Sequence, residues 1–164
     1  MPEAETRRRA AKDRREGKAP STQAGEFVRE EMEHIREGKH GARSTKQAIA
    51  IGLSKARRAG VKLAPPKSGA SSRTQRQAAR DTEAARHPHK PSRRRSRAVT
   101  QALKREGHSA ASHRAISRQA RSAAAKRSAG SRSAAARKAA RTKGPTLRSA
   151  AAKKAARTRA RRAG

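Results

Sequence analysis

The sequence has no cysteine, no tryptophan and no tyrosine, and Phe27 is its only phenylalanine. Without cysteine, the chain can form neither a disulfide framework nor a cysteine-ligated zinc site. With Phe27 as its single aromatic residue apart from histidine, it lacks the stacking platforms on which many single-strand-binding proteins place bases. These absences exclude disulfide-rich domains and modules that read nucleic acid mainly by base stacking.

Large apolar side chains are also scarce, because leucine, isoleucine, valine and phenylalanine together account for twelve of the 164 residues. So few cannot bury a sizeable core or hold a positioned catalytic triad, and we expect no enzyme and no cofactor. The sequence has no apolar run long enough to cross a membrane, and its start lacks the apolar segment of a secretory signal. We therefore expect a cytoplasmic protein without a membrane partner.

Acidic residues are few and unevenly placed. The chain has 45 lysines and arginines against 12 acids, a net charge of +33, and no acid follows Glu106. A field of this size attracts polyanions, of which nucleic acid is the commonest in a cell. Arginine outnumbers lysine by 31 to 14, and its guanidinium suits bidentate phosphate contact. The composition predicts binding to nucleic acid with little sequence preference, to DNA more than to RNA.

Residues 25–63 hold nine of the fourteen large apolar side chains, counting methionine. Their spacing predicts two amphipathic helices, and Gly38 and Gly60 can each end one of them. Ser44 and Gln47 form the capping pair that opens the second helix. We predict a helical hairpin at about residues 25–60, with a thin core made by Phe27, Val28, Met32, Ile35, Ile49 and Leu53.

The fold class expected is mostly α, with long basic arms that are disordered or transiently helical around this hairpin. The chain divides into an N-terminal arm (1–24), the hairpin (25–63), a Pro/Ser/Arg-rich linker (64–96) and an Ala/Lys/Arg-rich tail (97–164). A short helix between Thr74 and Arg86 is compatible with the linker composition. Helix-like runs also follow Arg97 and Ser112, and they echo the hairpin either as a degenerate duplicate or through composition alone.

The tail contains a true repeat. Residues 133–142 read SAAARKAART and residues 149–158 read SAAAKKAART, with a shorter copy at 122–127. On a helix, the three cations of each full copy occupy about 100° of arc. Because like charges four residues apart repel one another, we expect mostly coil in the free tail and helix on a phosphate backbone.

The candidate phosphate contacts are the cations of the second hairpin helix and its approach, one arginine cluster and the tail repeats. They are Lys39, Arg43, Lys46, Lys55, Arg57, Arg58, Arg93, Arg94, Arg95, Arg137, Lys138, Arg141, Lys153, Lys154, Arg157, Arg159, Arg161 and Arg162. Residues 38–41 precede a helix N-terminus and could seat one backbone phosphate. For Lys55, Arg57 and Arg58, an equal alternative is that they complement the helix dipole only.

Other candidate sites have simpler interpretations. His34 and His40 are expected to be solvated rather than metal ligands, and the His87-Pro88-His89 run is expected to be a plain loop. Glu30, Glu31 and Glu33 are expected to pair with cations on a solvent-facing helix rather than to act in catalysis. We therefore predict no metal site.

Residues 39–63 resemble a family of small basic bacterial proteins of unknown function, through the Lys46–Ile51 run KQAIAI and the Ala56–Gly60 run ARRAG. That family offers no catalytic residue to transfer. The tail is similar in composition to the C-terminal arms of linker histones and bacterial histone-like proteins, which implies DNA binding and compaction. The alternative is an RNA- or ribosome-associated protein whose hairpin docks on a protein partner, and self-association through the hairpin is a further expectation.

Overall fold

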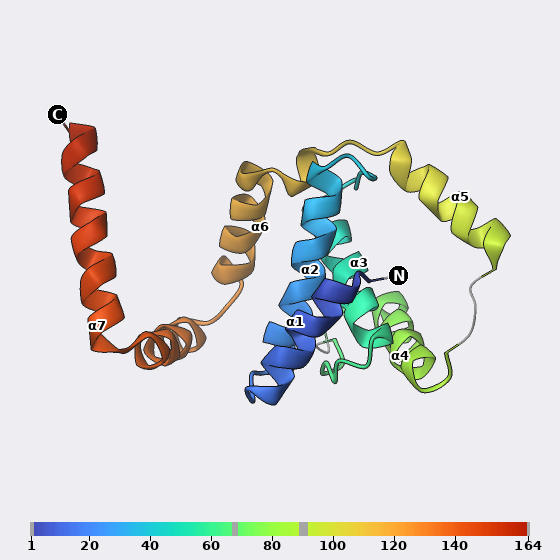
Figure 1. The fold of residues 1–164 in the computed structure, drawn as a ribbon, viewed down its shortest axis with the longest axis horizontal. Coiled ribbons are helices and arrows are strands. Elements are labelled where there is room, and N and C mark those ends of the chain that lie inside the picture. The colour runs from blue at the N-terminus through green and yellow to red at the C-terminus, as the bar shows by residue number, and fades with distance from the viewer. Residues whose placement is uncertain (1, 67–68, 89–91, 164) are drawn as a thin grey trace. The chain divides into compact units, whose positions relative to one another are not determined.

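The computed structural model describes residues 2–66, 69–88 and 92–163, and within these ranges it is mostly helical and contains no strand (Figure 1). The chain forms two compact units, residues 1–119 and 120–164. The helices are α1 (Ala4–Arg15), α2 (Pro20–Arg36), α3 (Thr45–Arg58), α4 (Ser72–Arg86), α5 (Arg93–Lys104), the short 3-10 helix η1 (Ser109–Ala111), α6 (His113–Ala125) and α7 (Ala129–Ala163).

The predicted hairpin is present as α2 and α3, which pack against each other in the first unit. Helix α2 begins at Pro20, earlier than expected, because proline is favourable in the first helical turn. Ser44 caps α3 by accepting from the amide of Gln47, as the capping pair predicts. Of the predicted core, Phe27, Met32 and Ile35 are buried, whereas Val28, Ile49 and Leu53 are only partly buried. Alanines supply most of the remaining core.

Residues 1–24, expected as an N-terminal arm, do not form a free arm, because α1 packs along α2. Thr6, Ala10 and Asp13 are its buried residues, and Ala10 joins a core cluster with Phe27. These three positions recur at helical spacing, which places them on one face of α1. No large apolar residue marks that face, so hydrophobic periodicity could not reveal it.

The expected linker also contains packed structure. Helix α4 covers the proposed range Thr74 to Arg86, begins two residues earlier, and packs against α3. Ser71 precedes it, and its hydroxyl accepts from the amide of Thr74 (3.2 Å). The buried face of α4 holds Ala78 and Asp81. The prediction of a short helix here is confirmed, whereas the description of residues 64–96 as linker is too coarse. His89 of the predicted histidine loop lies outside the described residues.

The second pair of helix-like runs does not form another hairpin. Instead, the segment from Leu103 to Gly107 lies against the α2–α3 turn through main-chain hydrogen bonds. The amide of Gly41 donates to the carbonyl of Leu103 (2.9 Å), and that of Ala42 donates to the carbonyl of Gly107 (3.1 Å). A Cβ on Gly41 would lie only 1.9 Å from the carbonyl oxygen of Glu106, so this close approach requires glycine.

Helix η1 continues the same docking. Its Ala110 and Ala111 are buried in a core cluster with Met32 and Ile35. The hydroxyl of Thr45 donates to the carbonyl of Ala110 (2.7 Å), and Nε of Arg36 donates to the carbonyl of Ala111 (2.8 Å). The turn end of the hairpin is therefore closed by a segment that lies some seventy residues later in the chain.

In the second unit the tail is helical, so the expectation of mostly coil in the free chain is not supported. Alanine has the highest helix propensity, and residues 129–163 are rich in it. The run is interrupted at Gly144, which has φ 68° and ψ 170°, and Pro145 follows. This break falls between the two full repeat copies and divides α7 into two helical segments.

Candidate nucleic-acid interface

Within the described residues, the carboxylates of the first unit are almost all paired with cations of the same unit. Of the twelve acidic residues, eleven lie within 4.0 Å of a lysine or arginine nitrogen, and Glu106 is the exception. Some of the predicted phosphate contacts therefore have a carboxylate partner within the fold, whereas others do not.

Lys55 is the most strongly engaged of the predicted contacts. Its Nζ lies 2.7 Å from Glu31 Oε2 and 3.6 Å from Glu30 Oε1, and its side chain is only 23% exposed. Glu30 and Glu31 are 1% and 0% exposed, so their expected placement on a solvent-facing surface is wrong. They instead line the contact between α2 and α3, where one ammonium group serves both carboxylates. Glu33 does fit the expectation, because it is exposed and pairs with Arg29 (3.6 Å).

Two more of the hairpin cations have acidic partners. Nζ of Lys39 lies 3.0 Å from Glu37 and 3.3 Å from Glu3, and these hydrogen bonds raise the pKa of Lys39, that to Glu37 more than that to Glu3. Nε of Arg58 lies 3.0 Å from the buried carboxylate of Asp81 and so joins α3 to α4. The positive charges of Lys39 and Arg58 are therefore partly neutralised by carboxylates within the fold.

Arg43 and Lys46 are exposed beside the start of α3 and have no carboxylate partner among the described residues. Arg57 is half-buried, and its guanidinium donates to the carbonyl of Ala64 (3.4 Å). The turn at residues 38–41 is expected to bind a phosphate. The amides of Gly41 and Ala42 instead donate to carbonyls of the docked 103–107 segment, so these amides are not available to a phosphate. Arg43 and Lys46 remain as the predicted contacts at this end of the hairpin that are exposed and have no carboxylate partner among the described residues.

The remaining predicted contacts are all exposed. Arg93, Arg94 and Arg95 form the first turn of α5, where no residue is buried. Residues 120–164 contain fifteen lysines and arginines and no acid. The predicted tail contacts, all exposed in the structure, are Arg137, Lys138, Arg141, Lys153, Lys154, Arg157, Arg159, Arg161 and Arg162. This unit therefore has the higher density of positive charge, +15 on 45 residues against +18 on the 119 residues of the first unit, and it contains no acidic residue with which its cations could pair.

The two full repeat copies have the same local structure. In the first, the hydroxyl of Thr142 donates to the carbonyl of Lys138 (3.0 Å), and in the second that of Thr158 donates to Lys154 at the same distance. Both copies are helical and exposed. Each copy presents its three cations on one side of a helical segment of α7.

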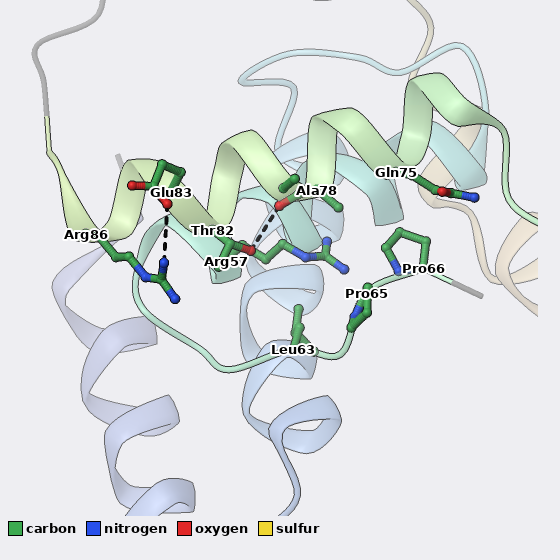
Figure 2. Close-up of a pocket in the computed structure, with 10 residues that line it drawn as sticks. Arg57, Leu63, Pro65, Pro66, Gln75, Ala78, Thr82, Glu83 and Arg86 are labelled. Carbon is green, nitrogen blue, oxygen red and sulfur yellow. Dashed lines mark hydrogen bonds and ion pairs between the residues drawn. The ribbon is translucent and has the colours of Figure 1, made fainter. Parts of the chain in front are cut away.

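One shallow cavity of about 370 Å³ lies between α4 and the extended segment that follows α3 (Figure 2). Leu63, Pro65 and Pro66 line one side, and residues of α4 line the other. Arg86 also lines it, but its guanidinium is paired with Glu83 (3.4 Å). The lining combines apolar packing with an ion pair, and we assign it no ligand.

The structure brings together a cluster that the sequence interpretation missed. Glu31, His34 and His40 each place one candidate ligand atom within 4.8 Å of the others. The histidine side chains are 13% and 15% exposed, so the expectation that they are solvated is wrong. The three-residue spacing of Glu31 and His34, which puts both on one face of α2, was the available signal.

The hydrogen bond from His34 Nε2 to Glu3 Oε1 (2.8 Å) and a second from Lys39 hold the pKa of Glu3 below its ordinary value, despite the exposure of that carboxylate. Glu3 thus ties the start of α1 to the end of α2 on the side of the histidine pair. No helix in the described part of the chain combines the length and apolarity needed to cross a membrane.

Residues 19–68 match the model of a family described as "Family of unknown function (DUF6496)". This segment contains α2 and α3 and covers less than a third of the chain, and it includes the stretch that resembles such a family in sequence. The match does not extend to the tail. No curated protein and no solved structure matches the chain.

Proposed function

We propose that the protein binds nucleic acid with little sequence preference, DNA more than RNA, and that residues 120–164 supply most of the contacts. One observation carries the proposal: this unit has fifteen cations and no carboxylate, and its predicted contact residues are all exposed. The first unit, by contrast, pairs nearly all its acids internally. Phosphate groups are the polyanionic partner that such an unpaired array attracts in a cell.

The repeat explains how the array would work. Arg137 and Arg141 are four residues apart, about 6 Å along a helix, and Lys138 lies beside them, so the three charges repel one another in the free protein. Phosphates placed against this side would remove the repulsion and release condensed counterions. The break at Gly144 lets the second copy, with Lys153, follow a different part of the backbone from the first.

The first unit then serves as a folded base for the basic segments. Several of its exposed cations have no carboxylate partner among the described residues. Of these, the predicted contacts Arg43 and Lys46 near the hairpin turn and Arg93–Arg95 on α5 would add contacts secondary to those of the tail. The proposal places the protein on the bacterial nucleoid, in a histone-like role. It requires no base-specific contact, and the single aromatic residue, Phe27, is buried in the hairpin core.

The test is a binding series against duplex DNA, duplex RNA and single strands of equal length across a range of salt concentrations. The full chain is compared with a chain that ends at Gln119. If about eight phosphates are neutralised, log affinity should fall with log salt at a slope of about −7. The shorter chain should bind far more weakly and show a shallower slope.

A salt-insensitive affinity, or equal binding by the shorter chain, would contradict the proposal. A clear preference for duplex RNA, together with binding of the Gln119-terminated chain to a protein partner, would favour the RNA- or ribosome-associated alternative. A strong preference for one DNA sequence would also argue against a mechanism that depends on phosphate contact alone.

A further inference from the structure

We propose that Glu31, His34 and His40 form a binding site for a divalent transition metal ion, with zinc as the best fit. Glu31 and His34 lie on the same side of α2, and His40 follows in the turn that leads to α3. Oε1 of Glu31 lies 3.3 Å from Nε2 of His40. Two ligands held about 2.1 Å from a tetrahedral ion are about 3.4 Å apart, so this pair already has the required separation.

The hydrogen bonding of His40 favours an ion between these two atoms. Nδ1 of His40 lies 3.1 Å from the carbonyl oxygen of Gly41. A carbonyl can only accept, so Nδ1 carries the hydrogen, and in the neutral ring Nε2 is a lone pair. That lone pair faces a carboxylate oxygen of Glu31. Two acceptors in contact repel unless a cation, either a proton or a metal ion, lies between them.

The burial of Glu31 supplies an independent argument for a cation at this place. Its side chain is fully buried, yet neither carboxylate oxygen has a well-aligned hydrogen bond. Nζ of Lys55 approaches Oε2 (2.7 Å), which leaves Oε1 directed at the histidine. A buried carboxylate oxygen without a proper partner is costly, and a metal ion would satisfy it.

His34 completes the set of three protein ligands. Its ring is edge-on to that of His40, with centroids 6.2 Å apart. The carboxylate of Glu3 accepts from Nε2 (2.8 Å) and so orients the ring in the way that carboxylates orient metal-binding histidines. On binding, the widest-spaced ligand atoms would close by up to about 1.5 Å, which side-chain rotation can supply.

Two imidazoles with one carboxylate favour zinc over magnesium or calcium, which prefer ligand sets made of oxygen. Three protein ligands leave a fourth position for water. A bound ion would link the end of α2 to the turn before α3. It would thereby stabilise the end of the hairpin against which the 103–107 segment and η1 pack. This inference is independent of nucleic-acid binding, because none of its ligands is a phosphate contact.

The test is titration of the full chain with Zn²⁺ and, separately, Co²⁺ and Mg²⁺ in a phosphate-free buffer. We expect one Zn²⁺ per chain, a rise in the Tm of the first unit, and the visible absorption of tetrahedral Co²⁺. His40→Ala and His34→Ala should each lower the zinc affinity at least tenfold. His87→Ala, which removes a histidine whose side chain is 81% exposed, is the matched control and should leave it unchanged.

Because an alanine variant could fail to fold, the imidazole NMR signals of the unaltered chain provide a second readout. Zn²⁺ should shift the signals of His34 and His40 and leave those of His87 in place, and Mg²⁺ should shift none of them. The proposal is overturned if Zn²⁺ shifts neither pair member, or if His40→Ala retains full affinity. The absence of any response to the metal ions would identify the cation between Glu31 and His40 as a proton.

Discussion

Gly52 and Val28 mark the closest approach between α3 and α2: a Cβ added to Gly52 would lie 2.7 Å from the Cα of Val28. It would also lie 3.0 Å from the carbonyl oxygen of Phe27, so backbone rather than a mobile side chain would have to move. Overpacking of this kind costs about 1–3 kcal/mol, against about 1 gained from helix propensity. We expect Gly52→Ala to lower the free energy of unfolding by up to about 2 kcal/mol, measured by chemical denaturation.

Gly25→Ala is the matched control for that prediction. Gly25 lies inside α2, is exposed, and has no atom within 4 Å of an added Cβ. Replacing an open helical glycine by alanine should stabilise the protein by about 1 kcal/mol. Two substitutions of the same chemistry should therefore have opposite signs, and equal effects would disprove the close packing of α2 on α3.

Lys55→Met should destabilise the first unit strongly. The methionine would leave the buried carboxylates of Glu30 and Glu31 without their shared ammonium group, and breaking a buried ion pair in this way costs about 3–5 kcal/mol. Lys46→Met, an exposed position on the same helix, should change stability by less than about 0.5 kcal/mol. Thermal unfolding of both variants decides the point, and a Lys55 variant as stable as the control would refute the pairing.

Asp81→Asn should loosen α4 from α3. The buried carboxylate of Asp81 accepts from Arg58 (3.0 Å) and from Gln77 (3.1 Å), so the neutral amide should cost about 1–3 kcal/mol. We expect faster amide hydrogen exchange in α4, with α2 unaffected. Glu83→Gln removes an exposed acid of the same helix and should leave exchange unchanged. If both variants exchange alike, Asp81 does not fasten α4.

Glu16 provides a test of pH dependence. A hydrogen bond from Lys18 holds the pKa of Glu16 below its ordinary value of 4.5. The carboxylate therefore stabilises the fold above about pH 4.5, and this contribution is lost as the pH falls through the lowered pKa. Glu16→Gln should have a slightly lower Tm than the parent at about pH 7, and this difference should shrink as the pH falls below about 4.5. Glu106→Gln, at an acid with no ion pair among the described residues, should show no such difference, and a gap that persists at low pH would exclude this cause.

Neutralising one repeat should change the salt dependence of nucleic-acid binding. The triple variant Arg137→Gln, Lys138→Gln, Arg141→Gln removes three charges, which should reduce the slope of log affinity against log salt by about 2.7. The matched control removes three exposed cations of α1 with Arg7→Gln, Arg8→Gln and Arg14→Gln. Equal changes in the two variants would mean that overall charge, rather than the repeat, governs binding.

The hairpin could be predicted because its signals are local. Phe27, Met32 and Ile35 repeat at helical spacing, and Ser44 and Gln47 identify the start of α3. The contacts of α1 and η1 could not be predicted, because their buried residues are small or polar. Ala10 and Ala111 are buried, but in an alanine-rich chain nothing distinguishes a buried alanine from an exposed one before the elements are placed.

The candidate site shows the same limit. The distribution of charge in the sequence identifies a basic tail. It does not show that Lys55 forms ion pairs with two buried carboxylates, whereas Lys46 has no carboxylate partner among the described residues. Which cations and carboxylates form ion pairs across α2 and α3 depends on which faces of the two helices meet. The packing of the helices determines this, and local sequence does not. The histidine cluster was missed for the same reason, because Glu31 was assigned to the solvent side.

The docking of Ala111 on the hairpin also has a consequence for the order of biosynthesis. The Arg36–Ala111 bond spans 75 positions, and a ribosome adding about 5–20 residues per second needs about 4–15 seconds to make that length. During this interval the nascent hairpin lacks the segment that covers its turn, so Met32 and Ile35 stay accessible to chaperones. Completion of the first folded unit must therefore await synthesis of η1, which lies close to the start of the second unit in the sequence.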